Sequence, residues 1–156
     1  MDRERVRQLL GQYGDDVFRL AMSYLGNRAD AEDISQNVFL SALNTRHEPS
    51  PDKEKAWLLT CTANACKNHL QSFWKRNVGV LDEAVPFRDE KDRSLYDAVM
   101  NLSPKYRAVI HLYYYEGYDQ REIAEILHLT RTAVQTRMSR AREMLKKELN
   151  DNEGAL

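Results

Sequence analysis

Residues 119–147 constrain the fold of this 156-residue chain more than any other stretch, because they hold two short helical patterns separated by a turn. Asp119 and Glu122 match a capping box, which starts a helix by satisfying its first free backbone N–H groups. The apolar side of this helix is Ile123, Ala124, Ile126 and Leu127. A helix this short is not stable alone, so we expect it to pack against a neighbour.

The second helix of the pair follows a turn at His128 and Leu129, with Thr130 as its predicted N-cap. Its apolar residues recur at steps of four, three and four, which indicates one buried stripe. They are Val134, Met138, Ala141 and Leu145. The opposite face is therefore predicted to be exposed.

That exposed face is polar and basic: residues 131–147 hold six Lys or Arg side chains and one acid, Glu143. Compact hydrogen-bonding side chains near a helix N-terminus, followed by arginines, suit base edges first and phosphates second. The alternative is the solvated basic face of an ordinary bundle. The predicted DNA-contacting residues are Arg131, Thr132, Gln135, Thr136, Arg137, Ser139 and Arg140.

Composition and charge limit the other possibilities. The formal net charge is −1, so any basic surface must be local and balanced by acidic surface elsewhere. No apolar run approaches the ~20 residues of a membrane helix, and the N-terminus lacks a signal-peptide pattern. We therefore expect a cytoplasmic protein without membrane insertion.

The potential metal ligands and nucleophiles form no recognisable site. Cys61 and Cys66 are five residues apart and would lie on different faces of a helix, which disfavours both a zinc site and a mutual disulfide. We interpret them as small, largely buried residues, with a redox role as the alternative. The four histidines are scattered, and no catalytic motif is evident. We expect no cofactor and no metal.

Helical periodicity extends over almost the whole chain, which predicts an all-α fold. The expected helices cover residues 8–25, 30–43, 52–76, 94–101 and 104–116, before the pair described above. In the second of these, the buried residues would be Ala31, Ile34, Val38 and Ala42. Glu32, Asp33, Gln36 and Asn37 then point outward, as a surface for a partner or as an ordinary wet helix face.

The longest helix, 52–76, has an inward stripe and a polar face. The stripe is Ala56, Leu59, Ala63, Cys66, Leu70 and Phe73. The polar face is Thr60, Asn64, Lys67, Asn68, Gln71 and Lys75. Amides and lysines near Trp57 and Trp74 suit phosphates and opened bases, although tryptophans more often serve packing.

Two polar segments divide the chain. Residues 44–51 carry two prolines and separate two helices, and residues 77–93 carry five acids and no sustained apolar face. The predicted architecture is two small helical domains, 1–76 and 94–149, joined by a flexible acidic linker, 77–93. A polar tail, 150–156, is expected to fray.

Four motifs, in this order and spacing, give the chain a specific resemblance. They are YLGNRADAEDISQNVFLSA (24–42), AWLLTCTANACKNHL (56–70), LSPKYRAVIHLYYYEGYDQREIAEIL (102–127) and LTRTAVQTRMSRAREML (129–145). The chain resembles bacterial RNA polymerase sigma factors of the extracytoplasmic-function (ECF) subfamily. The resemblance implies a protein that is not an enzyme and directs the polymerase to promoters.

The resemblance also implies partners and roles for the two domains. The partners would be the clamp and flap of core RNA polymerase, promoter DNA and a separate anti-sigma factor. Asp33, Gln36 and Asn37 would bind the clamp. The first domain would melt the −10 element and hold the opened strand, and the second would read the −35 element. The −10 residues would be Asn44, Arg46, His47, Asn64, Lys67, Asn68 and Gln71.

Several residues depart from the family pattern. Asn37 stands where Glu is usual, Thr132 where Gly is usual and Gln135 where Lys is usual. Glutamine can pair bidentately with adenine, whereas lysine favours guanine or phosphate, so the −35 preference is expected to be shifted. His128 occupies a turn position where glycine is common.

Two other classes of protein share some of these features. A helix-turn-helix repressor or activator would explain residues 119–147 but gives no purpose to the amide-rich long helix. An interaction protein, such as an anti-sigma factor or adaptor, would carry the basic face incidentally and bind no promoter.

Overall fold

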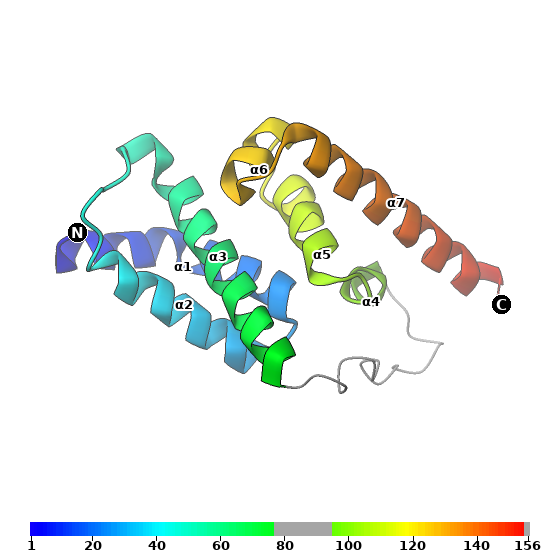
Figure 1. The fold of residues 1–156 in the computed structure, drawn as a ribbon, viewed down its shortest axis with the longest axis horizontal. Coiled ribbons are helices and arrows are strands. Elements are labelled where there is room, and N and C mark those ends of the chain that lie inside the picture. The colour runs from blue at the N-terminus through cyan, green and yellow to red at the C-terminus, as the bar shows by residue number, and fades with distance from the viewer. Residues whose placement is uncertain (77–94, 155–156) are drawn as a thin grey trace.

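The computed structural model describes residues 1–76 and 95–154, and within these ranges every regular element is a helix (Figure 1). This confirms the predicted all-α fold. The elements are α1 (Arg3–Leu25), α2 (Arg28–Ala42), the 3-10 turn η1 (Pro51–Lys53), α3 (Glu54–Arg76), α4 (Leu95–Met100), α5 (Pro104–Ile110), the π turn η3 (His111–Tyr115), α6 (Gln120–Leu127) and α7 (Arg131–Gly154). The predicted linker 77–93 and the side chains of Trp74 and Lys75 lie outside the described part.

Local hydrogen bonds set the ends of α1 and α2. The side chain of Asp2 accepts from the Arg5 amide at 2.7 Å, so α1 begins five residues before the predicted start. Its end is Gly26, at φ 65°, in the left-handed region that glycine tolerates. Asn27 then caps α2 by accepting from the Asp30 amide, which moves the predicted start of α2 back to Arg28.

The α3 helix is buried on more of its circumference than the periodicity predicted. Besides the expected Leu59 and Ala63, Leu58 and Thr62 are fully buried. The Thr62 hydroxyl is satisfied by donating to the carbonyl of Leu58, four residues earlier. A helix with two buried sides must have neighbours on both, and here α1 and α2 cover one and the C-terminal helices approach the other.

Two predictions at helix ends were wrong. Phe73, assigned to the inward stripe, is 43% exposed, because this last part of α3 extends past its packing partners. Residues 150–154, expected to fray, continue α7 to Gly154. They add a further turn to a helix that is already long.

The helices form two modules that pack against each other. The N-terminal module is α1–α3, and the C-terminal module is α4–α7 (Figure 1). Helix α1 contacts α5 and the π turn, while α3 contacts α6. The buried apolar residues of both modules join in one continuous cluster, so a shared seam connects them.

The π turn accounts for the geometry of this seam. A single helix was predicted from Pro104 to about Glu116, but the last turn widens: the Glu116 amide donates to the carbonyl of His111, five residues earlier, at 3.1 Å. The extra residue changes which side chains face the N-terminal module. His111 and Glu116 are largely buried there, whereas Tyr114 and Tyr115 are 61% and 56% exposed.

Candidate nucleic-acid and polymerase interfaces

The α6–α7 pair has the local geometry that its sequence predicted. The Asp119 side chain accepts from the Glu122 amide at 2.8 Å, and the Glu122 side chain accepts from the Asp119 amide at 3.1 Å, so the capping box is confirmed. His128 adopts φ 53°, in the left-handed region. Thr130 accepts from the Ala133 amide at 3.0 Å and caps α7. These short-range bonds fix the direction of α7 relative to α6.

The two sides of α7 separate cleanly. Val134, Met138 and Ala141 are fully buried, which confirms the apolar stripe, and Leu145 is half-buried. Of the seven residues predicted to contact DNA, only Arg137 is half-buried. The exposed ones are Arg131, Thr132, Gln135, Thr136, Ser139 and Arg140. Their roles toward DNA stay a prediction.

Another arginine of α7 is held against its own module. The Arg142 guanidinium donates to the Tyr114 hydroxyl at 2.9 Å and lies 5.3 Å from the centre of the Tyr113 ring. Exposed cation–aromatic contacts of this kind contribute about 0.5–1 kcal/mol. Arg142 therefore steadies the exposed tyrosines of the π turn.

The polar face of α3 is only partly open to solvent. Asn64, Asn68 and Gln71 are exposed, while Lys67 is half-buried. Burial, and secondly the positive charge of Arg137, lower the pKa of Lys67. Lys67 of α3 and Arg137 of α7 therefore lie close enough to repel each other.

Thr60, predicted on the same wet face, lies instead in the seam between the modules. Its hydroxyl oxygen is 2.8 Å from the carbonyl oxygen of Ile126 and 3.0 Å from that of Ala56, and it donates to these acceptors. Ile126 is in the last turn of α6, where carbonyls lack intrahelical partners. The prediction failed because helical periodicity does not show that a second module covers this face.

The loop before α3 carries three further candidate residues, Asn44, Arg46 and His47, all exposed. The loop is tied to the start of the chain, because the Met1 amino group donates to the Thr45 carbonyl at 3.1 Å and lies 3.5 Å from the Glu48 carboxylate. A loop anchored at its centre can present polar side chains without losing much further entropy.

The outward side of α2 holds the predicted polymerase contacts. Asp33, Gln36 and Asn37 are exposed, and the inward residues Ala31, Ile34, Val38 and Ala42 are buried as predicted. The sequence analysis missed an apolar groove of about 410 Å³ beside Gln36, between α1 and α2. Its rim includes Leu10 and Leu40, which are 49% and 59% exposed.

A sequence signal for this groove existed. Leu40 follows Gln36 by four residues, so a helix places this leucine on the polar face. A large apolar residue at such a position is better suited to a partner protein than to water.

Neither cysteine is positioned for reactivity. Both Cys61 and Cys66 are free thiols, and among the described residues no group of three or more His, Cys, Asp or Glu could hold a metal ion. Burial raises the pKa of Cys66 to about 12 and also raises the pKa of Cys61. Both thiols therefore stay protonated at neutral pH. In the described part of the chain, no helix has the length and apolar character needed to cross a bilayer.

Comparison with known proteins agrees with this two-module layout. Residues 9–76 match the family described as Sigma-70 region 2, and residues 92–145 match the family described as Sigma-70, region 4. The chain is 28% identical to the ECF RNA polymerase sigma factor SigW of Bacillus subtilis, over 96% of this chain and 91% of that protein. It is 30% identical to the RNA polymerase sigma factor SigV of the same organism, over 86% and 84%.

Solved structures show the same fold. The sigma factor RpoE from Bartonella quintana, crystallised with the anti-sigma factor NepR, superposes with a TM-score of 0.71 at 23% identity, covering 92% of this chain and 96% of that one. CnrH, in complex with the cytosolic domain of CnrY, gives 0.65 at 24% identity. With both regions matched in order and curated relatives covered over most of their length, the chain belongs to the ECF subfamily of RNA polymerase sigma factors, and its region 4 is DNA-binding.

Proposed function

We propose that this chain binds core RNA polymerase in the cytoplasm and directs it to promoters by recognising −35 and −10 elements and holding the melted −10 strand. The polymerase supplies the chemistry, and this chain is not an enzyme. The observation that carries the proposal is the polar face of α7, exposed beyond an intact capping box and turn, within a matched region 4.

Recognition of the −35 element falls to the exposed side of α7. The major groove admits a helix, and its base edges present hydrogen-bonding patterns that side chains can distinguish. Gln135, exposed near the start of α7, suits adenine. Arg131, Arg137 and Arg140 suit phosphates, which fix register and add a salt-dependent attraction.

The −10 strand falls to the N-terminal module. The exposed amides Asn64, Asn68 and Gln71 follow one face of α3, and Lys67 adds a positive charge among them. Asn44, Arg46 and His47 lie in the loop that precedes this helix. Opening each base step costs a few kcal/mol, so a polar surface that holds the separated strand stabilises the bubble.

The clamp of the polymerase is proposed to bind α2 and the groove beside it. Asp33, Gln36 and Asn37 supply polar contacts, while Leu10 and Leu40 supply apolar area that water leaves when a partner docks. The flap is proposed to contact region 4. A separate anti-sigma factor is a further proposed partner, because both similar solved structures hold a sigma factor with an inhibitory partner or a cytosolic domain.

Run-off transcription with core RNA polymerase tests this function directly. A library of promoter fragments is transcribed with and without the chain, and start sites that appear only with it should share spaced −35 and −10 elements. New starts that are absent, with duplex binding retained in a gel shift, would instead favour an ordinary repressor or activator.

A single substitution then tests the reading helix. Gln135→Lys should change the base preferred in a randomised −35 selection by roughly 1–3 kcal/mol at one position, without changing the helix content. The matched control is Lys105→Gln, the reverse exchange at an exposed position on α5. An unchanged −35 preference in Gln135→Lys would show that another residue faces the bases.

A further inference from the structure

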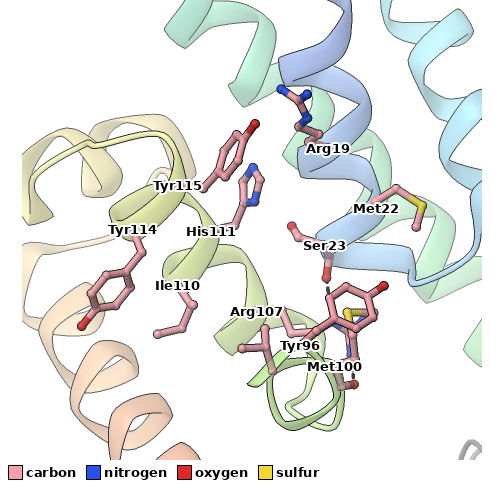
Figure 2. Close-up of a pocket in the computed structure, with 11 residues that line it drawn as sticks. Arg19, Met22, Ser23, Tyr96, Met100, Arg107, Ile110, His111, Tyr114 and Tyr115 are labelled. Atoms are coloured by element: carbon pink, nitrogen blue, oxygen red, sulfur yellow. Dashed lines mark hydrogen bonds between the residues drawn. The ribbon is translucent and has the colours of Figure 1, made fainter. Parts of the chain in front are cut away.

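The seam between the two modules is made of specific polar contacts, and Arg107 forms its centre. From α5, this arginine donates to the carbonyls of Ser23 at 2.6 Å and Tyr24 at 2.7 Å, in the last turn of α1. It also donates to the carbonyls of Leu102 and Met100 in its own module. Arg107 is only 9% exposed. One buried cation thus satisfies helix-end carbonyls of both modules (Figure 2).

A second contact joins α3 and α1 to the π turn. The Lys55 ammonium lies 2.7 Å from the carboxylate of Glu116 and 3.8 Å from that of Asp16. The Glu116 side chain is only 2% exposed. Burial lowers the pKa of Lys55, but the hydrogen bond to Glu116 outweighs it and the net shift is upward. Lys55 is therefore held charged between carboxylates of the two modules.

The third contact lies on the side of α3 proposed to hold the −10 strand. Thr60 donates to the carbonyl of Ile126 in α6. Two turns further along α3, Lys67 is half-buried beside Arg137 of α7, and each belongs to a proposed DNA-reading face. The closed arrangement therefore covers part of one reading face with the module that carries the other.

The seam is not fully packed. A cavity of about 440 Å³ lies between α1 and the helices α4 and α5. In Figure 2, His111 and Tyr115 point from the π turn toward Arg19 of α1, and Arg107 lies beside Ser23 at the other end of the cavity. Among the described residues, His111 Nε2 and Glu116 Oε1 have no hydrogen-bond partner. Such defects weaken an interface and favour its reversible opening.

We propose that the polar face of α3 is also a docking surface for region 4 of the same chain, so that the free protein holds itself closed and reads promoter DNA only after this seam opens. This inference rests on the proposed function for its consequence, because masking matters only if both faces bind DNA. The closure itself stands on the contacts of Arg107, Lys55 and Thr60 alone.

The dimensions of a promoter support the need for opening. Elements named −35 and −10 are about 25 base pairs apart, which is roughly 85 Å of duplex at ~3.4 Å per base pair. In the closed chain, Lys67 and Arg137 are near enough for one charge to affect the other. The two modules cannot reach both elements of straight DNA in this arrangement. Residues 77–94, if extended, could span roughly 60 Å.

X-ray scattering of the free chain tests the closure without any DNA. Lys55→Glu places a third carboxylate beside Asp16 and Glu116, so the radius of gyration should rise while the helical circular dichroism is retained. Lys105→Glu makes the same charge change at an exposed position outside the seam and should scatter like the wild type. An unchanged radius of gyration in Lys55→Glu would overturn the proposal.

The reversed pair provides a rescue. Lys55→Glu combined with Glu116→Lys restores opposite charges across the seam and should return the compact scattering. Thr60→Val removes the hydroxyl that bonds Ile126 with little change in shape, and it should open the chain partially. This variant replaces the rescue if the double variant does not fold, and a compact Thr60→Val with a compact Lys55→Glu contradicts closure.

DNA binding by the free chain tests the masking. The probe is a labelled duplex carrying the −35 and −10 elements found by run-off transcription. Lys55→Glu should bind it roughly tenfold more tightly than the wild type, because the binding-competent fraction rises, whereas Lys105→Glu should bind equally or more weakly. Tighter binding despite an added negative charge is a result that simple electrostatics does not produce.

The possible failures are distinguishable. An open Lys55→Glu chain that binds the duplex no better than wild type overturns the masking, while run-off transcription still supports the proposed function. If run-off transcription yields no promoter, the proposed function fails, and the scattering comparison still decides whether the free chain is closed.

Discussion

The α6–α7 pair and the seam between the modules are both held by hydrogen bonds at helix ends, but they differ in the distance between partners along the chain. In the pair, Asp119 and Glu122 bond each other, and Thr130 bonds the Ala133 amide. In the seam, Arg107 reaches carbonyls more than eighty positions away, and Thr60 bonds Ile126 across sixty-six. Local bonds make region 4 a preformed reader, whereas non-local ones decide whether it is accessible.

The largest effect is expected from removing the centre of the seam. Arg107→Ala leaves carbonyls of α1 and α4 without their buried donor, and the free energy of unfolding should fall by about 3 kcal/mol or more. Urea denaturation followed by circular dichroism measures this. Arg140→Ala, at an exposed site, is the control and should stay within about 0.5 kcal/mol of wild type. A similar loss in both variants would show that the seam adds no stability.

Alkaline pH probes buried groups that depend on long-range packing. The pKa of Cys66 is raised to about 12 from an ordinary value near 9, so its contribution to stability is fully present below pH 9 and is lost as the pH rises toward 12. Burial of Tyr24 raises its pKa and acts in the same direction. Stability should fall by about 1.4 kcal/mol per pH unit for each such group.

Denaturation curves between pH 8 and 11 measure this slope. Cys66→Ala lowers the stability at every pH but should make the dependence on pH shallower. An identical slope in the variant would exclude Cys66 as a cause.

A smaller effect should follow from breaking the local pair. Asp119→Ala removes the cap that accepts from the Glu122 amide, and the cost should be about 1 kcal/mol. Because the bond lies within α6, scattering by the free chain should stay compact, in contrast to the seam variants. Asp2→Ala removes the equivalent cap of α1 and provides a matched loss in the other module. Expansion of Asp119→Ala would contradict the division into local and non-local bonds.

The smallest effect is a gain. His128 adopts φ 53°, which costs a side chain with a Cβ atom more than it costs glycine. His128→Gly should raise the free energy of unfolding by a few tenths to about 1 kcal/mol. Thermal denaturation measures the change, and Glu125→Gly, inside α6, should do the opposite. A destabilised His128→Gly would mean that the imidazole makes contacts that outweigh the backbone strain.

The sequence predicted what short-range chemistry determines. Caps, the turn at His128 and the buried stripe of α7 each depend on residues within a few positions, so their patterns could be read directly. The start of α1 was missed because Asp2, rather than apolar periodicity, sets it. Helix type along α2 and α3 was correct because both have a clear inward side.

The seam could not be predicted in this way. Arg107 resembles an ordinary helix-surface arginine, and Thr60 belongs to a face of amides and lysines. Their burial depends on a second module arriving at that face, and hydrophobic periodicity carries no information about such a partner. The groove beside α2 is an intermediate case, because Leu40 breaks the polar pattern and marks the position, although not the occupant.

The π turn at His111–Tyr115 has a consequence for sequence change by insertion and deletion. Each residue advances an α-helix by ~100°, and this turn holds one residue beyond the regular number. Deleting a single residue there would restore regular α-helical winding and rotate everything that follows by about a quarter turn. The reading pair would stay intact, but its orientation toward the first module would be reset, so a one-codon change could alter the coupling of the two regions without altering either of them.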